Sequence, residues 1–218
     1  MKYNQKGFTL VEIAIVLVII GLLLGGILKG QEMITQAKIK NVIADFSGIS
    51  AAYHGYQDRY RAIPGDDPNA NTRWPGTTQG DGNGGVSGTY NFACSSPGST
   101  PGTNEGCFWW DHLRRAGFVG GAGTIQPFNA ATGLIGVQTG DAAGGAALGG
   151  FNGLIVCSSN LPDKIAIATD TQMDDGVPNA GTVRGMLQTG TNPNIAGATP
   201  PANYVENGTN TYTLCRSL

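Results

Sequence analysis

The sequence predicts an α+β fold: one long N-terminal helix, apolar and then amphipathic, followed by a globular head that contains a small antiparallel β-sheet. Three observations predict it: an apolar run near the N-terminus, an amphipathic repeat behind it, and a glycine- and proline-rich remainder. The expected segments are a short basic leader at residues 1–7, an apolar helix at 8–30, its amphipathic continuation at 31–63 and the head at 64–218.

The apolar run extends from Phe8 to Leu28, long enough to cross a bilayer as a helix, which needs about 20 residues. Lys2 and Lys6 precede it, so the positive-inside rule predicts a cytoplasmic N-terminus. A secretory signal peptide fits poorly, because the run is too long, lacks an A-x-A exit and continues into a helical pattern. An ordinary signal anchor is the stronger alternative.

The N-terminus combines a short basic segment, Gly7, and the stretch FTLVEIAIVLVIIGLLL. This arrangement resembles the class III leader of type IV prepilins and pseudopilins, and the resemblance covers the first 30 residues or so. It depends on the coincidence of Gly7, the Phe8 that follows and Glu12 four residues later. The resemblance implies cleavage between Gly7 and Phe8 by an inner-membrane prepilin peptidase, and N-methylation of the new Phe8 amine.

Glu12 is the one charged residue between Phe8 and Leu28. A carboxylate in hydrocarbon is costly unless a cation neutralises it. The new Phe8 ammonium could be neutralised by Glu12 of a neighbouring subunit or by Glu12 of the same helix, at i and i+4. Either pairing makes Glu12 a register device, because a subunit out of step leaves a charge unpaired. The alternative is a carboxylate that extends to the membrane interface.

Behind the apolar run, apolar side chains recur mostly at three- and four-residue steps until Pro64-Gly65 ends the pattern. They are Ile39, Val42, Ile43, Phe46, Ile49, Ala52, Tyr53, Tyr56 and Tyr60. As one helix, residues 8–61 would be ~80 Å long at ~1.5 Å per residue. Many type IV pilins carry a proline in the apolar half; this sequence has glycines there, which allow looseness or close helix approach.

The composition gives no reason to expect general nucleic-acid binding, because the net charge is −2 and the pI about 5.6. Charged residues make up 13 %, which is low for a freely soluble monomer. Two interpretations fit: a chain that buries surface against copies of itself, and a secreted chain with a polar surface rich in Gly, Asn and Thr.

The sequence has four cysteines, at Cys94, Cys107, Cys157 and Cys215. They form no C-x-x-C pair, and neither of the two histidines lies at metal-ligand spacing from them. An even number in an exported chain predicts two disulfides, for which three pairings exist. We prefer Cys94–Cys107, which closes a short loop, and Cys157–Cys215, which holds the C-terminal tail. Four reduced thiols are the alternative.

The head is expected to contain two short helices and a small sheet. The stretch CFWWDHLRRAGFVGG predicts an amphipathic helix with Phe108, Trp109, Leu113 and Phe118 facing the core and Asp111, Arg114 and Arg115 facing water. We expect His112 to be a surface or hydrogen-bonded residue rather than a catalytic one. Residues 133–140 and 149–158 predict two antiparallel strands, residues 164–173 a helix, and the tail around Cys215 a closing strand.

Two acidic groups are candidate cation sites. The stretch IPGDDPNANTRWPGTTQGDGNGG is similar to a segment of some prepilin-like proteins. Its candidate oxygen ligands for Ca²⁺ are Asp66, Asp67, Asp81 and Asn83. Turn chemistry explains the same residues without an ion.

The second group is Asp170, Asp174 and Asp175, in a stretch that is also similar to those proteins. Asp170 and Asp174 repel at i and i+4, and all three acids lie near the negative end of a predicted helix. Arg184, a bound Ca²⁺ or simple solvation could each compensate them.

An enzymatic function finds no support, because the sequence contains no G-x-S-x-G elbow, H-E-x-x-H pair, P-loop or cysteine with a plausible histidine base. No cofactor is required, and Ca²⁺ is the one candidate. The resemblance implies a structural subunit of a helical filament, held first in the bacterial inner membrane. Its implied partners are copies of itself, other pilins, the prepilin peptidase and an assembly platform. The alternatives are a periplasmic type II secretion pseudopilin and a minor pilin with an adhesive role.

Overall fold

The computed structural model describes residues 9–92, 94, 102–140 and 147–218. The chain divides into two compact units, Met1–Ala37 and Lys38–Leu218. The predicted processing residues Gly7 and Phe8 lie outside the described residues, so their roles stay predictions.

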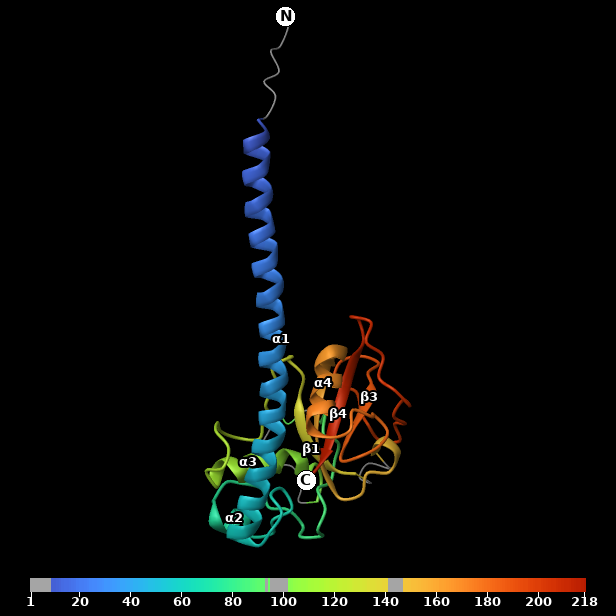
Figure 1. Cartoon of the computed structure of the whole chain (residues 1–218). Helices are drawn as coiled ribbons and strands as arrows, with labels where there is room; N and C mark the ends of the chain where they lie inside the picture. The colour runs from blue at the N-terminus through green and yellow to red at the C-terminus, as the bar shows by residue number, and fades with distance from the viewer. Residues whose placement is uncertain (1–8, 93, 95–101, 141–146) are drawn as a thin grey trace, which may run out of the picture. The chain divides into compact units, whose positions relative to one another are not determined.

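A single helix, α1, runs from Leu10 to Tyr60 over 51 residues and confirms the predicted long helix (Figure 1). At ~1.5 Å per residue it is roughly 75 Å long. It ends where Arg61 adopts a left-handed backbone with φ of 55°, ahead of the Pro64-Gly65 turn. Its N-terminal part has a window with a mean hydropathy of 2.8, long and apolar enough to cross a membrane.

Among its described residues, the head contains one four-stranded antiparallel sheet with the order β1-β2-β4-β3. Figure 1 labels β1, β4 and β3 of this sheet. The strands are β1 at Ile135–Thr139, β2 at Leu154–Pro162, β3 at Val183–Leu187 and β4 at Thr211–Ser217. β1, β2 and the closing strand β4 confirm the predicted strands. β3 is an addition: its five residues include a glycine and an arginine, so the local pattern for a strand is weak.

Three further helices lie in the described part of the chain. They are α2 at Ala70–Arg73, α3 at Glu105–Arg115 and α4 at Asp163–Met173, with a 3₁₀ turn at Ala147–Gly149. α3 and α4 confirm the two short helices predicted for the head.

The main core forms where the amphipathic part of α1 meets α3 and the sheet. Ile39, Val42, Phe46, Ile49, Ala52 and Tyr56 are buried, as their spacing predicts, and Ile43, Tyr53 and Tyr60 pack half-buried beside them. Trp109, Trp110 and Leu113 of α3 and Val137, Val156 and Leu214 of the sheet complete this core. Fully burying one large apolar side chain contributes about 1.5–3 kcal/mol, so this stripe explains why the second half of α1 folds with the head.

The expected faces of α3 are partly wrong. Asp111 is buried, because it accepts hydrogen bonds from Arg115 Nε at 2.8 Å and from the Thr77 hydroxyl, which compensate its desolvation. Phe118 is 37 % exposed and lies after the helix, beside Gly55 of α1, rather than in the core. His112 is buried and hydrogen-bonded, so of the two placements expected for it the hydrogen-bonded one is confirmed and the surface one is wrong.

Both preferred disulfides are present. Cys94 and Cys107 are joined across a separation of 13 residues, and their Cα atoms lie 5.4 Å apart. Cys157 and Cys215 occupy paired positions on β2 and β4, and their bond spans 58 residues. The second bridge therefore links two adjacent strands in the middle of the sheet and confirms that the C-terminal tail is held there.

Candidate functional site

The first turn of α1 is closed by a reciprocal contact between Thr9 and Glu12. The Thr9 backbone N–H and hydroxyl each donate to Glu12 Oε2 at 2.8 Å, and the Glu12 N–H donates back to Thr9 Oγ1 at 3.3 Å. This is a capping box, in which an N-cap Thr and a Glu three residues later satisfy each other's free backbone donors. Glu12 thus has a local structural role that we did not predict, although the T-x-x-E spacing indicates it.

The N-terminal part of α1 exposes a continuous apolar surface. Leu10 is 90 % exposed and Leu22 73 %, and the large apolar side chains from Leu10 to Ile34 are exposed throughout. An exposed apolar surface of this extent marks a membrane or protein contact. The chemistry available to this region is therefore packing against lipid or against other apolar helices.

The first acidic group brings together Asp66, Asp81 and Glu105, each with a carboxylate oxygen within 4.8 Å of the others. The backbone donates to both oxygens of Asp66, from Gly82 at 2.6 Å, Asn83 at 3.1 Å and Gly84 at 2.8 Å. Glu105, which we did not predict, accepts from the N–H groups of Asp81 at 3.1 Å and Ser87 at 3.0 Å. No local sequence signal relates Glu105 to residues about twenty positions earlier.

The other two predicted ligands lie differently. Asn83 is beside the group, but its side-chain amide donates to Asp81 Oδ2 at 2.9 Å, while its backbone N–H donates to Asp81 Oδ1 at 3.0 Å. All six carboxylate oxygens of Asp66, Asp81 and Glu105 therefore accept a hydrogen bond from the protein. Burial is the main cause that raises the pKa of Asp66, and the nearby Glu105 charge raises it further. This arrangement matches the turn chemistry that was the alternative to a cation site.

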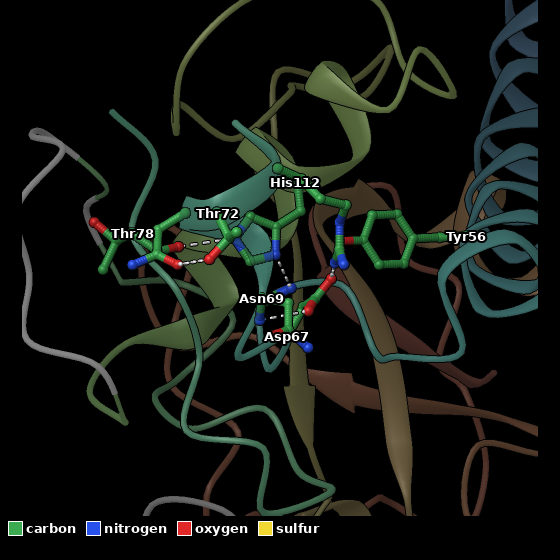
Figure 2. A network of polar contacts seen from close by, with 9 residues as sticks. Tyr56, Asp67, Asn69, Thr72, Thr78 and His112 are labelled. Atoms are coloured by element: carbon green, nitrogen blue, oxygen red, sulfur yellow. Dashed lines mark hydrogen bonds and ion pairs between the residues drawn. The ribbon is translucent and has the colours of Figure 1, made fainter. Parts of the chain in front are cut away.

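Asp67 belongs to a different polar network, shown in Figure 2. It accepts from the Tyr56 hydroxyl at 2.6 Å and from the Asn69 N–H at 2.9 Å, and it pairs with Arg73. Because Asp67 is fully buried, these partners are what make its charge tolerable.

His112 joins α3 to the two loops around this network (Figure 2). Its Nδ1 accepts from the Gly65 N–H at 2.9 Å, and its Nε2 lies 2.8 Å from the Thr78 carbonyl, to which it must donate. Both nitrogens are thus satisfied by the neutral ring. Burial lowers the pKa of His112 to about 4, because the charged form would be desolvated.

The second acidic group lies at the C-terminal end of α4, where Asp170, Asp174 and Asp175 each place a carboxylate oxygen within 4.8 Å of the others. Asp174 Oδ2 accepts from the N–H groups of Thr182 at 2.5 Å and Val183 at 2.9 Å, at the start of β3. Asp175 Oδ1 accepts from the Val177 N–H at 2.8 Å. The predicted triad is therefore assembled in space.

Asp170 is the buried member of this group. Its Oδ2 accepts from the Tyr204 hydroxyl at 2.6 Å, whereas its Oδ1 is buried without a hydrogen-bond partner in the described residues. Burial raises the pKa of Asp170 to about 6, and the charges of Asp175 and Asp174 act in the same direction.

The expectation that Arg184 compensates these acids is wrong. Its guanidinium donates to the carbonyls of Leu148 at 3.0 Å and Gly149 at 3.1 Å, and its centre lies 4.6 Å from the ring centroid of Phe151. Position in sequence is a poor guide here, because Arg184 is on β3, the edge strand of the sheet, and β3 contacts the 3₁₀ turn. None of the salt bridges among the described residues involves Asp170, Asp174 or Asp175.

Comparison with known proteins identifies one segment. Residues 2–28 match the family model described as the prokaryotic N-terminal methylation motif. No curated protein and no solved structure matches the chain. The motif belongs to a structural class of proteins. It overlaps the start of α1, the one helix among the described residues that is long and apolar enough to cross a membrane, which is consistent with membrane anchoring. The chain therefore carries the class III leader segment of type IV pilin-like proteins, on an α+β fold with a long N-terminal helix and a four-stranded antiparallel head.

Proposed function

We propose that the protein is a structural subunit of a type IV pilus-like filament that polymerises through its N-terminal helix. Cleavage between Gly7 and Phe8 and methylation of the Phe8 amine precede assembly. The observation that carries the proposal is the pairing of a methylation motif at residues 2–28 with a helix whose apolar side chains are exposed from Leu10 to Ile34.

The physical basis is that this surface has two compatible environments. In a bilayer it faces lipid, and the backbone polar groups between the ends of α1 are satisfied within the helix. In a filament the same surface packs against the apolar helices of neighbouring subunits. The transfer between them requires no refolding of the head, because the head's core uses residues of α1 from Ile39 onward.

Glu12 sets the register of an incoming subunit. Its carboxylate pairs with the Phe8 ammonium of a neighbour, so a misplaced subunit leaves a charge unpaired in an apolar interior. A pair with the Phe8 ammonium of its own helix is the alternative. The contact with Thr9 holds Glu12 at the helix start, so its position is set before a neighbour arrives.

The partners follow from this assembly route. They are further copies of the chain, other pilins, the prepilin peptidase and an inner-membrane assembly platform. Before assembly the subunit is anchored in the inner membrane with its N-terminus in the cytoplasm, and it then enters a surface pilus. We assign it no catalytic role.

A type II secretion pseudopilin or an adhesive minor pilin would use the same N-terminal segment. The two disulfides of the head indicate that it folds outside the cytoplasm, because such bonds persist in oxidising surroundings. The periplasm is oxidising as well, so the disulfides fit a surface pilus and a periplasmic filament equally.

The test is to shear filaments from the source cells and to identify their main component by mass spectrometry, including its N-terminal peptide. We expect this chain to dominate and to begin with methylated Phe8. A chain that is cleaved but present in traces would indicate a minor pilin or a pseudopilin instead. A mature chain that starts at Met1 or Lys2 would contradict the proposal.

A matched pair of variants tests the cleavage step separately. Gly7→Val should block cleavage, because it changes the residue at the scissile bond. Gly21→Val should leave cleavage unchanged, because in α1 a side chain at Gly21 meets no atom within 4 Å. Loss of cleavage in both variants would show that the apolar helix, rather than the leader, controls processing.

A further inference from the structure

We propose that Asp170, Asp174 and Asp175 bind one calcium ion that ties the end of α4 to the start of β3. The site is independent of filament assembly. It rests on two observations: three carboxylates converge at the end of α4, and one of them has a buried oxygen without a hydrogen-bond partner among the residues that the structure describes.

The geometry suits a single hard cation. Ca²⁺ binds oxygen at ~2.3–2.6 Å, so two oxygens on one ion lie at most about 5 Å apart. One carboxylate oxygen from each of the three residues lies within 4.8 Å of the others. Asp174 and Asp175 are partly or fully exposed, so water can supply the remaining ligands that Ca²⁺ requires.

The unpartnered oxygen is the independent evidence. Asp170 has no exposed surface, and Tyr204 occupies its Oδ2, yet Oδ1 has no hydrogen-bond partner in the described residues. Buried carboxylate oxygens are ordinarily satisfied, and an exception points to a missing ligand. The first acidic group provides the contrast, since all six of its carboxylate oxygens accept hydrogen bonds from the protein.

The electrostatic surroundings also call for a cation. α4 has no basic residue in its last turn, and Asp174 is its C-cap, where the helix dipole is negative. None of the salt bridges among the described residues involves the three acids, and Arg184 is engaged by Leu148 and Gly149. A divalent cation would neutralise most of this charge.

The site would act as a fastener of the head. Asp174 already accepts from Thr182 and from Val183, the first residue of β3. Tyr204, which donates to Asp170, lies in the loop before β4. Gly181 allows the close approach: its φ is +72°, and a Cβ there would collide with the Asp174 carboxylate. A bound ion therefore joins α4, β3 and the loop before β4 at one point.

The test uses the full chain in detergent micelles, with CaCl₂ as the probe. Equilibrium dialysis with radioactive calcium should give one ion per chain, and the thermal midpoint should rise by several degrees in 5 mM CaCl₂ relative to EGTA. MgCl₂ at the same concentration should stabilise much less, because Mg²⁺ demands a stricter octahedral geometry.

The discriminating variant is Asp175→Asn, because Asp175 is exposed and its replacement leaves the buried Asp170 intact. It should weaken calcium binding more than tenfold while the protein stays folded in EGTA. Asp58→Asn, at an exposed residue of α1, is the control and should bind as wild type does.

Three results would overturn the proposal: no bound calcium in wild type at 5 mM, unchanged binding in Asp175→Asn, or loss of binding on Asp81→Asn instead. The last result would place the ion at the first acidic group. Equal stabilisation by Mg²⁺ would overturn the assignment to calcium. None of these outcomes bears on whether the chain is cleaved at Gly7, so failure here is distinct from failure of the proposed function.

Discussion

The two halves of α1 have the same backbone and opposite surroundings. In the second half, Phe46 is 1 % exposed and belongs to the core of the head. In the first half, Leu17 is 64 % exposed and belongs to no hydrophobic core among the described residues. The comparison teaches that one continuous helix can be stabilised in two ways. One half gains stability from its own chain, and the other must gain it from a membrane or from other subunits.

The largest expected effect separates the two halves by function. Glu12→Gln should reduce filament yield more than tenfold, because it removes the negative charge that neutralises the Phe8 ammonium. Glutamine also fits the capping box, so the helix start and the thermal midpoint should stay unchanged. The measurement is pilin in the sheared fraction relative to the whole cell.

The matched control for Glu12→Gln is Asp58→Asn, at the other end of the same helix. Asp58 forms an exposed pair with Arg61 at 3.5 Å, and exposed pairs contribute little. Its filament yield should match wild type. A similar yield from both variants would show that the Glu12 charge does not direct assembly.

The next effect concerns stability. Phe46→Ala should lower the free energy of unfolding of the head by about 3–5 kcal/mol, because it leaves a cavity in a packed core. Leu17→Ala, in the exposed half, should change it by less than about 0.5 kcal/mol. Denaturant titration in micelles, followed by fluorescence of the buried Trp109 and Trp110, measures both. A comparable loss in Leu17→Ala would contradict the division of the helix.

A smaller effect depends on pH through His112, which stacks on Tyr56 at the end of the buried half. Burial lowers the His112 pKa from 6.5 to about 4. Between these two pH values the ring is neutral in the folded state and protonated in the unfolded state. Its contribution is complete above pH 6.5 and is lost as the pH falls through about 4. The total is about 3 kcal/mol at 1.36 kcal/mol per pKa unit.

The check is to compare unfolding at pH 7 and pH 4 in wild type and His112→Gln. The glutamine amide can accept and donate as the neutral ring does, so the variant should lose less stability on acidification. His54→Gln, at an exposed histidine, is the control and should behave as wild type. An identical pH dependence in wild type and His112→Gln would contradict the role of His112.

The smallest effect tests a single hydrogen bond. Tyr56→Phe removes the donor at 2.6 Å from buried Asp67 and should cost about 1–2 kcal/mol, since Asp67 keeps Asn69 and Arg73 as partners. Tyr53→Phe loses a half-buried bond to Gln57 and should cost less than about 0.5 kcal/mol. Urea titration of the pair measures the difference, and equal costs would show that burial of Asp67 adds nothing.

Much of the fold was predictable because its signals are local. The apolar run and the spacing of Ile39, Val42 and Phe46 indicated α1 and its buried stripe, and the strand pair β1–β2 followed from alternating short runs between glycines. Both disulfides followed from simple pairing preferences. β3 was missed, because a five-residue strand with Gly185 and Arg184 is recognised only by its pairing with β4.

What the sequence determined by itself is the N-terminal segment and the helix behind it, since a methylation motif and a helical period are both read over neighbouring residues. Only the tertiary structure decided where charged side chains find their partners. Glu105 joins Asp66, Asp111 is buried beside Arg115, and Arg184 turns to the carbonyls of Leu148 and Gly149 instead of the acids of α4. The physical reason is that a charge in a partly buried site is stabilised by the donors and acceptors that the fold brings within hydrogen-bond distance, and sequence separation does not limit which residues those are.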